Sequence, residues 1–283
     1  MTPTDTAPGL FDGLFDDAAV FPPGDAPMAD AVRLHRERWA TPQAPLLGPF
    51  ICSFPRWAEL TGELTGGAPL AVSLTLPSGA DQVDAAIAEV GAEPRVRLVA
   101  LEVPASAATL STLIAALDRY APPGVPTYVE LPLGDVTPAQ VAALVGAGLR
   151  LKVRTGGVVA SAFPSEPALA AAVQAAVRGD AAFKLTAGLH DPIRHRDPAT
   201  GFEHHGFLNV LVATSRAIDG ADTEAVAAAL ADQDGARIAA AIAGMDAVTA
   251  ARVRRHFVSF GTCSVVEPID GLRHHGLLRE EQR

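Results

Sequence analysis

The chain has 283 residues and a mass of 29.2 kDa; 49% of the residues are hydrophobic, 19% are charged, and the net charge is −10 with a pI of about 5.2. This composition is typical of a globular protein that can bury a sizeable core. The acidic balance argues against nucleic acid or an anionic membrane as the main partner, because both require a basic face.

Neither the N-terminal segment nor the cysteines suggest export. The N-terminal segment lacks the basic and apolar regions of a secretory signal, and no apolar run reaches the roughly 18 residues of a membrane span. Cys52 and Cys263 are far apart and match no disulfide or zinc pattern. We therefore expect a cytoplasmic protein with two reduced thiols.

Short apolar runs alternate with longer alanine-rich segments along the whole chain. The runs have the length of strands, and the segments between them carry apolar residues at helical spacing. Ser106, Thr137 and Ser165 stand where helix N-caps are expected, and Pro138 and Pro167 lie near first-turn positions. In chain order, the runs are LFDDAAVFPP, GPFICSF, APLAVSLTLP, RVRLVALEVP, VPTYVELPL, RLKVRTGG, AAFKLTAG and HFVSFGTCS.

Eight strands that alternate with helices predict an α/β fold, a (β/α)8 TIM barrel. No linker or internal repeat divides the chain, so residues 1–283 are interpreted as one barrel domain. Residues 189–256 are too long for a single helix between the seventh and eighth strands. They are interpreted as an extended helical loop or insertion over one mouth of the barrel.

The chain contains only two lysines, Lys152 and Lys184, against 20 arginines. Side chains alternate between the two faces of a strand, and the outer face of a barrel strand must be apolar to receive helices. Glu102, Glu130, Lys152 and Lys184 are therefore expected to point into one cavity, each toward the C-terminal, catalytic end of its strand.

Two buried carboxylates and two buried ammoniums allow two interpretations. They could form an ion-pair network that fixes the barrel without chemistry. Alternatively, one lysine could attack a carbonyl carbon, because a neighbouring cation in a dry pocket lowers its pKa and leaves a neutral amine. Arginine cannot lose its proton in a protein and could not take that place, which would explain why lysine was kept at two positions.

The chain resembles the deoxyribose-phosphate aldolase group of class I aldolases along its whole length. KVRTGG is similar to the family's KTSTG-like sixth strand, which carries the Schiff-base lysine, and KLTAGL to its KASGG-like seventh strand with the second lysine. SFGTCS is similar to the RIGTSSG-like phosphate-binding strand, ICSFPRW to a CVNPRW-like second strand, and FDDAA to a DHT-like first strand. The resemblance implies Lys152 as nucleophile, Lys184 as the residue that lowers its pKa, and Glu102 as proton shuttle, with Glu130 matching a fifth-strand glutamate.

The motifs depart from the family pattern at several places. Arg154 and Gly157 alter the sixth-strand motif, Glu102 replaces an aspartate, and Ala187 replaces a glycine. The long segment 189–256 stands where the family has a short helix.

Substrate-binding residues are expected on the last three strands. Barrels often bind phosphate there through loop and helix N-terminal amides, whereas arginines can hold a carboxylate bidentately. The glycines at these strand ends, Gly156, Gly157, Gly188 and Gly261, could also simply turn the chain. The candidates are Arg154, Thr155, Gly156, Gly157, Gly188, His190, Arg194, Gly261, Thr262 and Ser264.

The segment after the seventh strand is rich in histidine and acidic residues, which zinc or iron would accept as ligands. No HExxH or comparable spacing appears, so no metal and no cofactor are expected. The residues in question are His190, His195, His204, His205, Asp191, Asp197 and Glu203.

Together these features predict a class I, Schiff-base lyase that makes or breaks a carbon–carbon bond of a small aldehyde or ketone in carbohydrate metabolism. Two alternatives remain: a non-covalent lyase or isomerase that uses the same cavity, and a catalytically silent protein that binds a metabolite on an aldolase scaffold. The sequence leaves open the donor, the acceptor, phosphorylation of the substrate and whether the chain forms a homo-oligomer.

Overall fold

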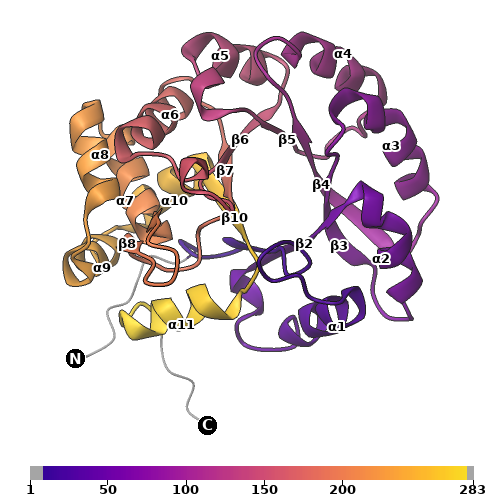
Figure 1. The fold of residues 1–283 in the computed structure, drawn as a ribbon, viewed down its shortest axis with the longest axis horizontal. Coiled ribbons are helices and arrows are strands. Elements are labelled where there is room, and N and C mark those ends of the chain that lie inside the picture. Colours follow the sequence, from indigo (N-terminus) through magenta and orange to yellow (C-terminus); the bar gives the residue numbers. More distant parts are fainter. Residues whose placement is uncertain (1–8, 279–283) are drawn as a thin grey trace.

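The computed structural model describes residues 9–278, and its centre is a closed barrel of parallel strands (Figure 1). The strand order around the barrel is β1-β10-β7-β6-β5-β4-β3-β2, so the chain runs once around and closes between its first and last barrel strands. The barrel strands are β1 (Phe15–Asp17), β2 (Leu47–Ser53), β3 (Leu70–Thr75), β4 (Val96–Pro104), β5 (Thr127–Glu130), β6 (Arg150–Arg154), β7 (Phe183–Thr186) and β10 (Phe257–Thr262). The prediction of a (β/α)8 barrel is confirmed.

Helices alternate with the strands and form the outer ring (Figure 1). Their apolar faces cover the outward-pointing apolar residues of the strands, such as Val153 and Leu185, which are 1% exposed. The ring consists of α1 (Met28–Arg38), α2 (Trp57–Glu63), α3 (Val83–Gly91), α4 (Leu110–Tyr120), α5 (Pro138–Gly146), α6 (Glu166–Arg178), α10 (Ala247–His256) and α11 (Val266–His274).

The helix starts were only partly predicted. Thr137 caps α5, where its side chain accepts a hydrogen bond from the amide of Gln140, and Ser165 is the N-cap residue of α6. The prediction for Ser106 is wrong, because α4 begins at Leu110 with Thr109 as its N-cap residue. The Ser106 amide donates to Thr109 Oγ1 (2.9 Å) and its carbonyl accepts from the Thr109 amide (3.1 Å), so these residues form a turn ahead of the helix.

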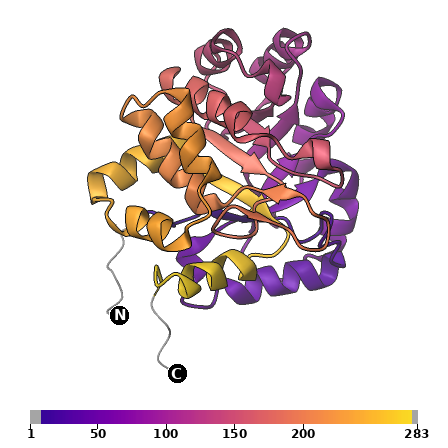
Figure 2. The same ribbon diagram turned by 60° about the vertical axis from the view of Figure 1, so that its left-hand side comes forward.

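The segment between β7 and β10 is more elaborate than a helical loop. It starts with an antiparallel hairpin, β8 (His195–Arg196) and β9 (Glu203–His204), and continues through α7 (Phe207–Ile218), α8 (Thr223–Ala231), α9 (Gly235–Ala243) and α10. Helix α10 leads directly into β10, so this connection holds three helices more than the single helix of a barrel repeat. Figure 2 shows these helices gathered on one side of the barrel.

Helix α7 fastens the added helices to the barrel. Its residues 207–214 are all buried, as expected of a helix covered on every side. Phe207 packs against Phe15 of β1 (ring centroids 5.6 Å apart) and Phe260 of β10 (5.3 Å). These contacts place Phe15 on the outer face of β1, and by alternation they turn the next residue, Asp16, into the barrel. Within residues 9–278, no helix combines the length and the apolar character needed to cross a bilayer.

Candidate active site

The two lysines lie side by side inside the barrel. Lys152 of β6 and Lys184 of β7 are register partners, and Glu130 of β5 is the register partner of Lys152. Both lysine side chains are buried, at 6% and 1% exposure. The lysines occupy the middle of their strands, whereas Glu130 is the last residue of β5; the prediction that all four charged residues lie toward the strand ends is therefore wrong for the lysines.

Glu102 joins the two lysines through its two carboxylate oxygens. Lys184 Nζ donates a hydrogen bond to Oε1 (2.6 Å), and Lys152 Nζ lies 2.7 Å from Oε2. The hydroxyl of Ser73 on β3 also donates to Oε1 (2.6 Å), while Oε2 makes a close ion pair but no well-aligned hydrogen bond. One carboxylate therefore bridges both ammoniums.

The bridge continues to the buried end of the network at Asp16. Lys184 Nζ donates to Asp16 Oδ2 (2.5 Å), and so does the hydroxyl of Ser259 on β10 (2.8 Å). Lys184 is thus enclosed between two buried carboxylates, with the ring of Tyr128 5.3 Å away. Sequence reasoning did not select Asp16, Ser73 or Ser259 as site residues.

At the other end the network reaches solvent. Lys152 Nζ lies 2.8 Å from Glu130 Oε2, and Arg154 Nε donates to Glu130 Oε1 (3.0 Å). The Arg154 side chain is 53% exposed. In spatial order the chain of charges is Asp16, Lys184, Glu102, Lys152, Glu130 and Arg154, and its three carboxylates balance its three cations.

The pKa shifts differ from one residue of this charged network to the next. Burial alone would raise the pKa of Glu102, but the ammoniums of Lys152 and Lys184 outweigh it and lower that pKa well below its usual range. Burial alone would lower the pKa of Lys184, yet Asp16 and Glu102 raise it strongly, so Lys184 stays protonated. Burial raises the pKa of Asp16 against the opposing effect of Lys184, and Glu130 keeps a lowered pKa because Lys152 and Arg154 outweigh its burial.

The glycines after β6 and β7 bring two backbones into contact. A Cβ on Gly156 would lie 2.7 Å from Gly188 Cα, and Gly188 has a φ of +72°. The hydroxyl of Thr155 donates to the carbonyl of Ala187 (2.6 Å), which fastens the two loops further. Gly157 is exposed, and a Cβ there would meet Ala162 at 2.8 Å. Thr155, Gly156 and Gly188 are therefore engaged in loop packing.

Of the candidates at the end of β10, Thr262 lies next to His190. Thr262 Oγ1 lies 3.3 Å from His190 Nδ1 and donates to the carbonyl of Ser264 (3.0 Å). A Cβ on Gly261 would approach the side chain of Ile51 at 3.1 Å, so this glycine makes room for β2. Cys263, which sequence reasoning treated as an ordinary thiol, also contacts His190.

The partners of Arg194 lie on α6 and in the segment between β7 and β10. Arg194 is buried, lies 2.6 Å from Glu166 and 3.4 Å from Glu203, and donates to His205 Nδ1 (3.4 Å). Its charge is therefore compensated away from the lysines. His205 donates from Nε2 to the carbonyl of Pro164 (2.8 Å), which fixes its neutral tautomer.

We expect His205 to make the protein less stable in mild acid. Burial, together with Arg194, lowers the pKa of His205 to about 4, against opposition from its hydrogen bond to Pro164. The stability that follows from this shift is present above the unfolded pKa near 6.5 and is lost as the pH falls toward about 4. His205 should therefore account for a loss of about 2 kcal/mol between pH 7 and pH 5. Denaturant unfolding at both pH values checks this, and the loss should shrink by that amount in His205→Gln; an unchanged pH dependence in the variant would contradict it.

The remaining histidines of the hairpin interact in pairs. His195 Nε2 lies 3.2 Å from Asp191 Oδ2, and its ring lies 5.2 Å from that of His204, which also packs on Phe163. In the part of the chain that the structure describes, no three His, Cys, Asp or Glu side chains are grouped to hold a metal ion. The hairpin therefore rests on the loop after β6 through ring contacts.

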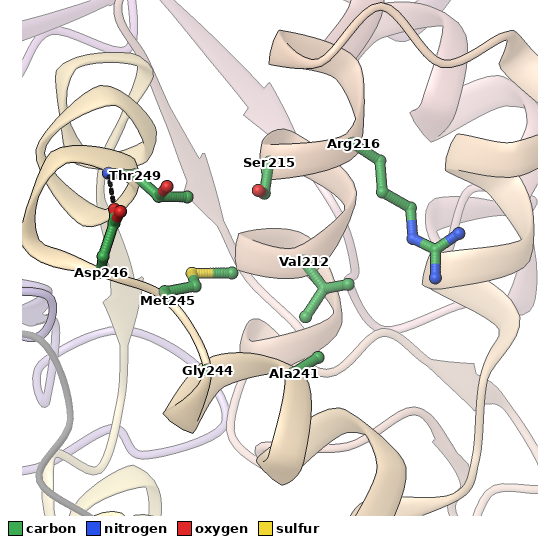
Figure 3. A pocket seen from close by; sticks show the side chains of 8 residues that line it. All are labelled: Val212, Ser215, Arg216, Ala241, Gly244, Met245, Asp246 and Thr249. Atoms are coloured by element: carbon green, nitrogen blue, oxygen red, sulfur yellow. Dashed lines mark hydrogen bonds between the residues drawn. The ribbon is translucent and has the colours of Figure 1, made fainter.

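A shallow depression of about 320 Å³ lies outside the barrel, between α7, α9 and α10 (Figure 3). Residues of α7 and α10 face each other across it, and Asp246 uses its carboxylate to cap α10 at the amide of Thr249. None of the barrel's charged residues lines it, so we place the candidate site in the barrel, where the ionisable groups converge. Its lining residues are Val212, Ser215, Arg216, Ala241, Gly244, Met245, Asp246 and Thr249.

Fold and site together define a (β/α)8 barrel with a buried lysine–carboxylate network. No family model, curated protein or solved structure matches the chain.

Proposed function

We propose that the protein is a class I aldolase-like lyase in which Lys152 forms an imine with a small carbonyl substrate and a carbon–carbon bond is then made or broken. The observation that carries this proposal is the sharing of Glu102: two lysines on adjacent strands, at one register level, contact the two oxygens of a single buried carboxylate. An ion-pair network needed only for stability could be replaced by apolar packing.

The surroundings of the two lysines suggest different roles. Lys184 is enclosed by Asp16 and Glu102 and stays protonated, so it cannot serve as the nucleophile. Lys152 lies next to Glu130 and the exposed Arg154, at the end of the network that reaches solvent. We therefore assign the nucleophile to Lys152 and the fixed cation to Lys184.

The steps follow from these contacts. Lys152 transfers a proton to Glu130 or Glu102, whose oxygens lie 2.8 and 2.7 Å from its Nζ, and the free amine attacks the carbonyl carbon. The resulting carbinolamine loses water to give the imine, and the same carboxylates can return or remove protons. When the carboxylate returns its proton, the protonated imine takes the place of the Lys152 ammonium, so the balance of three anions and three cations persists.

Trapping of the imine tests this proposal. The protein is incubated with acetaldehyde, pyruvate, dihydroxyacetone or glyceraldehyde 3-phosphate and reduced with borohydride, and adducts are located by peptide mass spectrometry. We expect an adduct on Lys152 with at least one of these compounds, whereas Lys184 stays unmodified because it is protonated and 1% exposed. The N-terminal amine serves as the internal measure of non-specific labelling. An adduct on Lys184 alone would reverse the two roles.

A non-covalent reaction is the second candidate, and one observation favours it. The ammonium of Lys152 is held between two carboxylates, as suits a residue that donates a proton and remains charged. If the reaction is non-covalent, we expect turnover of a carbonyl compound but no adduct that borohydride can trap. Binding of a metabolite without turnover would instead indicate a silent scaffold.

A further inference from the structure

A cysteine, a histidine and a glutamate form a separate cluster at the C-terminal mouth of the barrel. Cys263 directly follows β10, His190 follows β7, and Glu267 lies in the first turn of α11. Cys263 Sγ lies 3.7 Å from His190 Nε2, and Glu267 Oε2 lies 2.8 Å from His190 Nδ1. The proposed imine chemistry uses none of these three residues.

The contacts of His190 show which ring nitrogen carries the proton when the imidazole is neutral. The carboxylate of Glu267 can only accept a hydrogen bond, and the hydroxyl of Thr262 already donates to the carbonyl of Ser264, so His190 Nδ1 carries the proton. Nε2 is then left with a free lone pair, and the sulfur of Cys263 lies 3.7 Å from Nε2 and 3.8 Å from Nδ1. This is the order of groups that activates a nucleophile: thiol, base, and carboxylate that orients the base.

Cys263 packs closely against the backbone of Gly24. A Cβ on Gly24 would lie 2.9 Å from Cys263 Cβ, so only glycine allows this close approach. Burial raises the pKa of the Cys263 thiol to about 11, so it is protonated at neutral pH. The thiol therefore needs a base at the moment of attack, and His190 Nε2 is in place to act as one.

We propose that Cys263 is a nucleophile that adds to the carbonyl carbon of a small aldehyde at the mouth of the barrel, with His190 as its base and Glu267 as the positioning carboxylate. In this step the C–S bond forms and the C=O π bond breaks. The thiol proton moves to His190 Nε2 and from there to the carbonyl oxygen, which gives a neutral hemithioacetal without any oxidant or reductant. The proposal does not depend on an imine at Lys152.

Alkylation of the native protein by iodoacetamide tests the reactivity of the thiol, and Cys52 provides the internal control. Cys52 is fully buried, and burial raises the pKa of its thiol to about 12. We expect Cys263 to be alkylated first at pH 7.5 and His190→Ala to slow its alkylation by at least about tenfold, the lower end of general-base effects. Equal rates for both cysteines, or an unchanged rate in His190→Ala, would overturn the proposal.

Two further measurements show whether Glu267 and Cys263 take part in the proposed reaction or only in packing. Glu267 holds His190 through Nδ1, so Glu267→Gln should slow alkylation of Cys263 at pH 7.5; this side chain is 56% exposed, so the substitution should preserve the fold. Acetaldehyde should also protect Cys263 from alkylation in Lys152→Ala, where no imine can form at that position. An unchanged alkylation rate in Glu267→Gln, or an absence of protection, would count against the proposal, whatever the outcome of imine trapping.

Discussion

Replacing Lys184 with methionine is expected to lower the free energy of unfolding by about 3–5 kcal/mol, the usual cost of removing one partner from a buried ion pair. The substitution leaves Asp16 and Glu102 without the cation that lies 2.5 and 2.6 Å from their oxygens. Chemical denaturation at pH 7, with circular dichroism as the readout, measures this change.

Two control variants show whether charge causes the loss. Lys152→Met should cost less, because Glu130 is 20% exposed and retains its contact with Arg154. Asp16→Asn combined with Lys184→Met should recover part of the stability, because one unpaired buried charge disappears. If Lys184→Met were as stable as the original protein, the network would not be an electrostatic unit.

The largest functional effect is expected at Lys152. Lys152→Arg keeps a cation between Glu102 and Glu130 but removes the only group there that can become a neutral amine. We expect it to abolish the borohydride-trapped adduct and to reduce turnover of the trapped carbonyl compound by roughly 10³-fold or more, as when a covalent nucleophile is lost. Adduct yield and steady-state rate measure the two effects.

Lys152→Met is the matched variant without the charge. If the two variants are equally inactive and Lys152→Arg retains the melting temperature, the missing function is nucleophilicity. Full turnover in Lys152→Arg would instead mean that a cation is sufficient, and the non-covalent alternative would replace the imine.

The barrel could be predicted from the sequence because the patterns that indicate its strands and helices are local and repeated. Period-2 alternation placed Lys152 opposite Val153 and Lys184 opposite Leu185, and parallel neighbours at one register level then bring the two ammoniums together. Ser106 shows where local signals fail: a serine three residues before a threonine can cap a helix or form a turn, and here it forms the turn.

Asp16 and Cys263 required the folded structure for different reasons. In the strand FDD two aspartates are adjacent, and alternation alone does not say which one enters the barrel; Phe207 on the distant helix α7 decides this by packing on Phe15. Cys263, His190 and Glu267 are separated by up to 77 residues and meet only because β7 and β10 are neighbours. No spacing motif encodes such a meeting.

The network that contains the lysines also bears on how the chain folds. Asp16 is bound by Ser259, 243 residues away, and by Lys184, 168 residues away, so its contacts are among the least local in the molecule. Such contacts form late, because the loop between their partners must first be closed. Until β10 pairs with β1, Asp16 lacks Ser259, and the first strand has only β2 as a barrel neighbour. Completion of the charged network is therefore tied to closure of the barrel, and the reactivity of Lys184, which contacts Asp16, would report during folding whether that closure has taken place.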